Sequence, residues 1–128
     1  MSSLHGVEAR LEGALEPLGL SLGKFGLLSN LMAAGEPLPL RALAERCACV
    51  RSNITQLVDR LEVDGLVTRE ADPQDRRSVR AGLTAKGRAR HAAASLALAA
   101  AERDVLAPLS EAQRDLLVTL LRSLRSGT

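Results

Sequence analysis

The chain has 128 residues, which suits one domain, and 17 basic and 15 acidic side chains leave it a formal charge of +2. Hydrophobic residues make up 46% but Phe25 is the sole aromatic residue, so the core must use Leu, Val and Ala, which favours packed helices over a β-sandwich. A charged fraction of 25% argues against a disordered polyelectrolyte or a membrane protein, and without an export leader we expect a cytoplasmic protein.

The charge is distributed unevenly along the chain. Between residues 41 and 90, eleven basic side chains stand against seven acidic ones, a local excess of +4, whereas the two flanks together carry −2. Fifteen of the 17 cations are arginine, the side chain suited to bidentate contacts with phosphate and guanine. This pattern indicates a nucleic-acid partner, although a solvated surface would give the same pattern.

Two helices are expected before residue 36. Apolar residues at three-to-four spacing predict a short amphipathic helix over about residues 3–16, and Pro17 and Gly19 end it. Ser21 is placed to cap a second helix, whose apolar residues again fall on one face. Gly35 ends this second helix, as glycine commonly does just past a helix C-terminus.

A helix-turn-helix is expected next. Apolar residues recur at i, i+3, i+4 and i+7 over about Pro39 to Arg46 and again over about Val50 to Asp64, and only a tight connection separates the two helices. Ile54, Leu57, Val58 and Leu61 form the apolar face of the fourth helix. The opposite face is centred on Ser52, Gln56 and Asp59, with Asn53, Thr55 and Arg60 beside it.

The hydrophobic period then changes to that of strands. A β-prone run at about 66–70 and the alternation of Val79, Ala81 and Leu83 with polar or small residues predict two short strands. The segment 72–77, Asp-Pro-Gln-Asp-Arg-Arg, is a turn by composition. Two strands around a charged tip form a β-hairpin, which after a helix-turn-helix is the wing of a winged helix.

Two further helices complete the chain. Thr84 is placed to cap a long Ala-rich helix that ends near Leu106, and Ser110 and Gln113 form a capping box for the last helix. The last helix carries one leucine stripe, made of Leu116, Leu117, Leu120, Leu121 and Leu124. We expect this stripe to form a dimer interface, with packing inside the monomer as the alternative.

Five ordered motifs carry a resemblance to a known family. They are LAER at 43–46, RSNITQLVDRLE at 51–62, DGLV at 64–67, DPQDRRS at 72–78 and LTAKG at 83–87. In this order and spacing they resemble the MarR family of bacterial transcriptional regulators. The resemblance implies a single domain over residues 1–128, mainly α with a small β-hairpin wing. A winged helix-turn-helix at about 38–84 is expected between N- and C-terminal dimerisation helices at about 3–16 and 85–125.

The resemblance also implies a function and its partners. The chain is expected to be a sequence-specific DNA-binding transcriptional regulator, and more specifically a repressor. As a homodimer it would bind a pseudo-palindromic operator in double-stranded DNA, with half-sites one helical turn, about 10 bp, apart. The alternative is a winged-helix module that binds another protein and no DNA.

The fourth helix is expected to supply most contacts with DNA. The residues expected there are Arg51, Ser52, Asn53, Thr55, Gln56 and Arg60. Asn and Gln pair bidentately with adenine, whereas Ser and Thr more often bind phosphate or contact a thymine methyl group. The two arginines are expected beside the DNA backbone. Asp59 would repel phosphate, so we expect it to pair with a nearby arginine.

The start of the fourth helix is expected to differ from the family pattern. At the position of Val50 the family usually has a small polar residue that caps the helix, so the helix start is expected to shift to Ser52.

The wing is expected to contribute Asp75, Arg76 and Arg77. An arginine at a hairpin tip enters the narrow minor groove, where negative potential is focused. The resemblance assigns this role to Arg77 and places Asp75 in the same Asp-x-Arg motif. Arg76 is expected on a backbone phosphate. Asp75 is expected to fold back onto a neighbouring guanidinium and hold the tip in shape.

Cysteines and histidines bear on metal and redox chemistry. Cys47 and Cys49 are one residue apart and cannot form a disulfide framework. Cys47 falls on the apolar stripe of its helix, so both cysteines are expected to be structural, with redox sensing as the alternative. A zinc site needs more ligands than these, and His5 and His91 are expected at the surface, so no metal or cofactor is predicted.

The sequence also bears on catalysis and on binding of a small effector. No nucleophile elbow, phosphate-binding loop, zinc-protease motif or paired-carboxylate constellation occurs, so the chain is not expected to be an enzyme. The resemblance implies a small effector, often a phenolic anion in the family, bound between the dimer helices and the winged domain. A single aromatic residue offers such a ligand poor stacking, so the effector is only a hypothesis.

Overall fold

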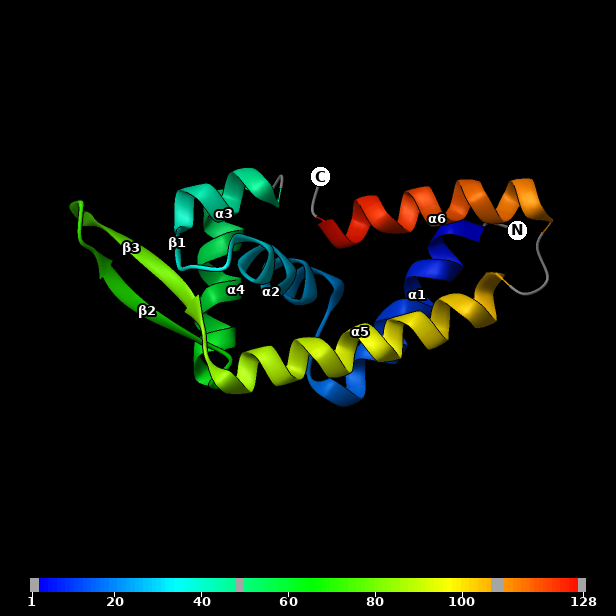
Figure 1. Ribbon diagram of the computed structural model, residues 1–128, viewed down its shortest axis with the longest axis horizontal. Helices are drawn as coiled ribbons and strands as arrows, with labels where there is room; N and C mark the ends of the chain where they lie inside the picture. Colours follow the sequence, from blue (N-terminus) through cyan, green and yellow to red (C-terminus); the bar gives the residue numbers. More distant parts are fainter. Residues whose placement is uncertain (1–2, 48–49, 107–109, 127–128) are drawn as a thin grey trace.

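The computed structural model describes residues 3–47, 50–106 and 110–126, which form a mainly helical fold with one small antiparallel sheet, as predicted (Figure 1). The helices are α1 (Ser3–Leu15), the 3-10 helix η1 (Glu16–Leu18), α2 (Leu22–Ala34), α3 (Leu40–Arg46), α4 (Arg51–Val63), α5 (Ala85–Leu106) and α6 (Glu111–Ser126). The strands are β1 (Leu38–Pro39), β2 (Val67–Asp72) and β3 (Asp75–Leu83). Within these described ranges no helix is both long and apolar enough to cross a membrane.

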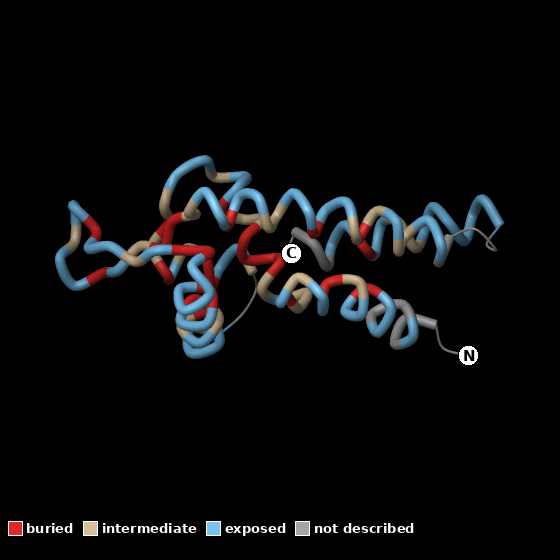
Figure 2. The backbone as a smooth tube through the Cα atoms, turned by 90° about the horizontal axis from the view of Figure 1, so that it is seen from below, coloured by how far each residue is buried: buried red, intermediate tan, exposed pale blue. Residues whose placement is uncertain are grey.

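The winged helix lies at one end of the molecule and a helical part lies at the other. In Figure 1, α3, α4 and the hairpin of β2 and β3 form the first end, α1 and α6 lie at the second, and α5 runs from one to the other. Figure 2 shows that buried residues concentrate where the two parts meet. The most buried large side chains come from both parts and include Leu11, Leu15, Leu27, Leu28, Ile54, Leu61, Leu98 and Leu121. One leucine-rich core therefore fixes the winged end on the helical end.

Helix starts follow the predicted caps. The hydroxyl oxygens of Ser21, Thr84 and Ser110 each accept the backbone N–H three residues later, at 3.1, 2.9 and 3.3 Å. The Gln113 side chain in turn accepts the N–H of Ser110 at 3.1 Å, which completes the capping box. These local bonds satisfy N–H groups that have no partner inside the helix, which is why the boundaries were predictable.

The start of α4 differs from the prediction. The helix begins at Arg51, directly after Val50, whose backbone is extended. The Val50 carbonyl accepts the N–H groups of Asn53 and Ile54 at 3.1 and 3.3 Å. The expected shift of the start to Ser52 is therefore wrong, because the backbone of Val50 starts the first turn without a polar side chain.

The sheet also extends further than predicted. Its strand order is β1-β3-β2, all antiparallel, and β2 and β3 pair from Val67 with Leu83 to Asp72 with Asp75. Only two residues, 73 and 74, form the turn, so the predicted six-residue turn at 72–77 is wrong. The Asp72 carboxylate accepts the N–H of Gln74 at 2.9 Å and closes the chain tightly. As a result Arg76 and Arg77 lie in strand β3 rather than in a loop.

Candidate nucleic-acid interface

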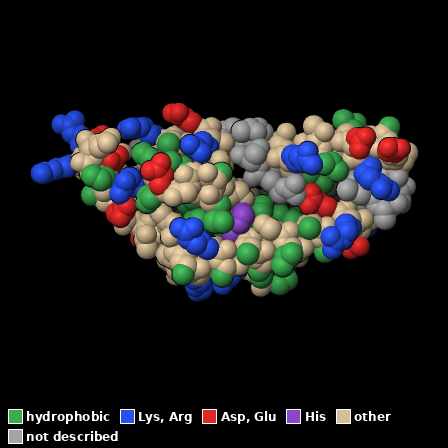
Figure 3. Space-filling model, viewed as in Figure 1, with side chains coloured by type: hydrophobic (Ala, Val, Ile, Leu, Met, Phe, Trp, Pro, Cys, Tyr) green, Lys and Arg blue, Asp and Glu red, His purple; other side chains and the backbone are tan. Residues whose placement is uncertain are grey.

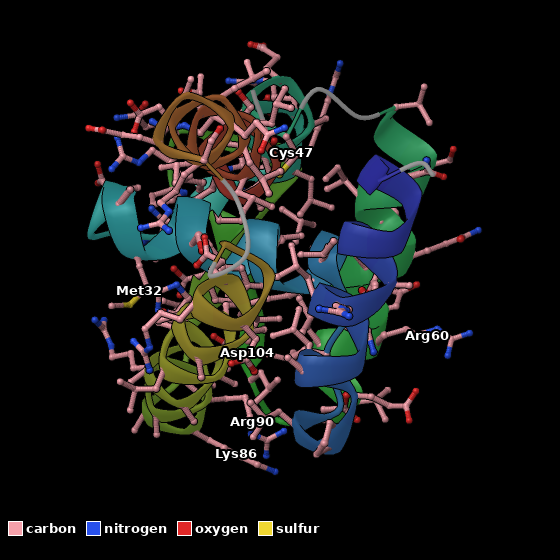
Figure 4. All side chains as sticks on the ribbon, turned by 90° about the vertical axis from the view of Figure 1, so that its right-hand side faces the viewer. Met32, Cys47, Arg60, Lys86, Arg90 and Asp104 are labelled. Atoms are coloured by element: carbon pink, nitrogen blue, oxygen red, sulfur yellow. The ribbon has the colours of Figure 1, made fainter. Side chains whose placement is uncertain are left out.

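Helix α4 presents a polar face outward because its apolar face packs into the core. Ile54, Val58 and Leu61 are 0% exposed and anchor the helix in the core. On the other side the structure exposes the side chains of Ser52, Asn53, Gln56, Asp59 and Arg60 and half-buries that of Thr55. Arg51 belongs to the helix, but its side chain lies outside the described residues. Figure 4 shows Arg60 extending from α4 away from the rest of the molecule.

Asp59 pairs with an arginine, as predicted, and the structure identifies it as Arg69 of β2. The Nε of the same guanidinium lies 3.5 Å from Oε1 of Glu62, one helical turn further along α4. On the other face of the hairpin Arg80 of β3 pairs with Glu70 of β2 at 2.5 Å. The sequence signal for the first contact was the i, i+3 spacing of two acids on α4, but nothing local specified which arginine they would meet.

Two arginines form the exposed end of the wing. Arg76 and Arg77 are both exposed, and Figure 3 shows basic side chains projecting from the hairpin end of the molecule. The Asp75 carboxylate accepts the backbone N–H of Arg77 at 3.0 Å. The predicted contact of Asp75 with a guanidinium is therefore replaced by a bond to the backbone. A short aspartate side chain readily reaches the backbone N–H two residues later in the chain. Asp75 thus shapes the tip and leaves the arginine side chains outside.

A cavity of about 530 Å³ lies between α2, α5 and α6. Figure 3 shows a hollow there, with a histidine side chain among apolar ones. The residues that line the cavity are Phe25, Ser29, Asn30, Ala33, His91, Ser95, Leu98 and Arg122. Because α2 packs against α3 and α4 of the helix-turn-helix as well as against α5 and α6, this cavity adjoins both parts of the molecule.

His91 lines this cavity and is half-buried, so its predicted surface position is correct only in part. Its ring stacks on Phe25 with ring centroids 4.9 Å apart and an angle of 3° between the planes. A hydrogen bond of 2.9 Å joins its Nε2 to Oγ of Ser29. The chain's one aromatic residue therefore does meet a second planar ring. This pair could not be predicted because α2 and α5 are far apart in the chain, and the only signal in the sequence was one histidine in an Ala-rich helix.

The position of His91 predicts a loss of stability in acid. Burial lowers the pKa of His91 below 6.5, and the Arg122 guanidinium lines the same cavity. The unfolded chain therefore takes up a proton on His91 more readily than the folded chain does. The contribution of neutral His91 to the free energy of unfolding is fully present above pH 6.5 and is lost as the pH falls through the lowered pKa of the folded protein. Thermal unfolding of wild type and His91→Phe between about pH 8 and pH 5 should show a smaller loss of Tm in the variant. An equal loss in both proteins would assign the effect to other groups.

The structure describes one of the two cysteines, Cys47. Cys47 is half-buried and packs against the core, and its Sγ accepts a 3.4 Å hydrogen bond from Nδ2 of Asn30. This agrees with the predicted structural role of Cys47. Cys49 lies outside the described residues, so its structural role stays a prediction and redox sensing by the pair stays the alternative. In the part of the chain that the structure describes, no three His, Cys, Asp or Glu side chains gather as metal ligands.

Comparison with known proteins gives a consistent result. Residues 18–78 match the model of the MarR family. The HTH-type transcriptional regulator YkoM of Bacillus subtilis is 41% identical over 69 residues, which are 54% of this chain and 44% of YkoM, so the chain spans under half of that relative. The HTH-type transcriptional repressor Rv2887 of Mycobacterium tuberculosis is 33% identical over 116 residues, which are 91% of this chain and 83% of Rv2887.

A solved structure agrees over the whole fold. The organohalide-sensing transcriptional regulator RdhR-CbdbA1625, crystallised with 2,4-dichlorophenol, superposes with a TM-score of 0.81 at 27% identity. The match covers 97% of this chain and 73% of that chain. Sequence, domain model and backbone thus agree with the winged helix and its flanking helices described above. The chain belongs to the MarR family of transcriptional regulators.

Proposed function

We propose that this chain is a sequence-specific DNA-binding regulator, and that it represses transcription as a homodimer on a pseudo-palindromic operator. The observation that carries the proposal is the exposed polar face of α4 next to a wing whose end exposes Arg76 and Arg77. A helix of this kind fits the major groove, and an arginine at a wing fits the adjacent minor groove. The names of relatives such as the repressor Rv2887 support repression, and regulators of this type are not enzymes.

Each part of the chain has a role in this proposal. Residues 1–128 act as one domain, in which about 38–84 bind DNA and the helices at about 3–16 and 85–125 dimerise. On α4, Asn53 and Gln56 read bases, Ser52 and Thr55 contact phosphate or thymine methyl groups, and Arg51 and Arg60 lie along the backbone. On the wing, Arg77 enters the minor groove, Arg76 binds phosphate and Asp75 holds the tip.

Selection of bound duplexes from a random DNA library tests this function. We expect an enriched pseudo-palindrome whose half-sites are about 10 bp apart. Binding to that operator should weaken steeply as salt rises, because phosphate contacts release counterions. A library without any enriched palindrome, or binding with little salt dependence, would instead favour a winged helix that docks on proteins.

The leucine stripe of α6 predicts the oligomeric state. Leu117 and Leu121 pack on the protein's own core, but Leu116 and Leu120 are 65% and 42% exposed. Their contact with a second copy would bury this apolar surface, so Leu116→Glu with Leu120→Glu should shift the homodimer towards monomer in sedimentation velocity. Val63→Glu, at a position of α4 that is 85% exposed, is the matched control and should leave the dimer intact. Dimers of unchanged stability in the double variant would place the interface elsewhere.

The cavity beside His91 is proposed as the effector site. The related regulator RdhR-CbdbA1625 is crystallised with 2,4-dichlorophenol, a small planar ring. The cavity here offers the paired rings of Phe25 and His91 for such a ligand, with Arg122 to balance an acidic hydroxyl group. Titration of 2,4-dichlorophenol into the protein–operator complex should release DNA, and Arg122→Ala should weaken that response. Affinity for DNA that does not change at any concentration would remove the compound from the proposal.

A further inference from the structure

Arg69 joins the wing to the helix that is proposed to read DNA. Its guanidinium leaves β2 and pairs with Asp59 and Glu62, two acids one turn apart on α4. The Arg69 side chain is 27% exposed. Its Nε is shielded from solvent and has no hydrogen-bond partner among the described residues, so its 3.5 Å approach to Glu62 is an ion pair without a hydrogen bond. Asp59 lies on the same face of α4 as Ser52 and Gln56, at three- and four-residue spacing. The contact therefore attaches the wing to the face that carries the proposed base contacts.

Little else holds the outer wing in place. Leu66 and Val67 are buried at its base, but past Arg69 the exposed side chains include Glu70, Ala71 and Val79. Asp72 and Ser78 are the buried exceptions, and the Asp72 carboxylate binds the turn of the hairpin itself rather than α4. A two-stranded ribbon without an apolar anchor keeps no fixed direction by itself. Its angle to α4 then depends on the base of the hairpin, where β1 pairs with residues 80 and 81 of β3, and on the ion pairs of Arg69.

These ion pairs are too exposed to matter much for folding. Asp59 and Glu62 are 54% and 45% exposed, and ion pairs in such positions contribute little to the free energy of unfolding. The same pairs nevertheless restrict where the wing lies, because they hold the guanidinium of β2 within ion-pair distance of two carboxylates of α4. Their main consequence is therefore geometric, and it reaches the spacing between α4 and Arg77.

We propose that Arg69 is a positioning residue, which holds the wing at the angle where Arg77 enters the minor groove while α4 occupies the major groove. The inference rests on the proposed function. It makes an unusual prediction for the acids, because removal of negative charge near DNA ordinarily strengthens binding. If Asp59 and Glu62 hold the wing through Arg69, their neutralisation must weaken binding instead.

The test uses the full-length dimer and the operator selected from the random library. Asp59→Asn with Glu62→Gln should weaken operator binding about fivefold, and Arg69→Ala about tenfold. In an Arg77→Ala background, both losses should fall below about twofold, because the wing no longer makes the contact that it is held for. Arg69→Lys should recover part of the affinity, since an ammonium group meets one carboxylate but not both.

Arg80→Ala is the matched control, since it breaks an arginine–carboxylate pair that lies within the hairpin and does not reach α4. Its effect should be the same with and without Arg77. Tighter binding by the acid variants, or effects of Arg69→Ala and Arg77→Ala that simply add, would overturn the positioning role. If Arg69→Ala does not fold, the surface variants of Asp59 and Glu62 decide alone. A wild-type protein that selects no DNA would refute the proposed function itself, which is a separate result.

Discussion

Arg77→Ala is expected to weaken binding to the selected operator by about 1–3 kcal/mol and to leave the dimer folded. The side chain is exposed at the wing, and the hydrogen bond that Asp75 accepts comes from the backbone N–H of Arg77, which alanine keeps. The substitution therefore removes a guanidinium without changing the hairpin. The loss is large because a narrow minor groove focuses negative potential on an inserted cation.

Titrations of wild type and Arg77→Ala measure this loss, and Arg76→Ala is the matched control. Arg76 is also exposed, one residue earlier in β3, and we propose that it meets phosphate. Its loss should weaken binding to all sequences alike, whereas Arg77→Ala should also reduce the preference for a narrow, A·T-rich groove at the wing position. Wild-type affinity in Arg77→Ala would remove the wing from the mechanism, provided that the Tm of the variant is unchanged.

Local interactions explain which parts of the fold were predictable. The caps at Ser21, Thr84 and Ser110 and the apolar spacing of α4 involve residues within one or two turns, so the sequence displays them directly. Strand β1 is only Leu38 and Pro39, and it exists through pairing with residues 80 and 81 of β3. No local pattern distinguishes two such residues from a loop, so β1 was missed.

The candidate site divides in the same way. The polar face of α4 follows from helical period alone, and the structure exposes the predicted residues Ser52, Asn53 and Gln56. The hydrogen bond between Ser29 and His91 joins residues 62 positions apart, and it could not be predicted before α2 and α5 were placed together. Asp59 is an intermediate case, because its repulsion of phosphate predicted an arginine partner, but only the fold identified Arg69.

Gly87→Ala is expected to destabilise the protein by about 3 kcal/mol or more, the upper range for an overpacked core. A Cβ at Gly87 would lie 2.1 Å from the carbonyl oxygen of Leu66 and 3.0 Å from its carbonyl carbon. Both are backbone atoms of a completely buried residue, and the same carbonyl accepts the N–H of Thr84 at 3.1 Å. The first turn of α5 would therefore have to separate from the base of the wing. Chemical denaturation of the purified variant measures the loss.

Gly23→Ala separates this clash from the general effect of adding a methyl group to a helix. Gly23 is also in the first turn of a helix, but the nearest atoms to a Cβ there belong to the Leu57 and Ser21 side chains, at an ordinary 3.8 Å. Its replacement should leave stability unchanged or raise it by about 0.5–1 kcal/mol, because alanine is the better helix former. If Gly87→Ala were as stable as Gly23→Ala, α5 would not press on Leu66. The wing would then be free to tilt at its base, and the ion pairs of Arg69 would be left alone to set its angle.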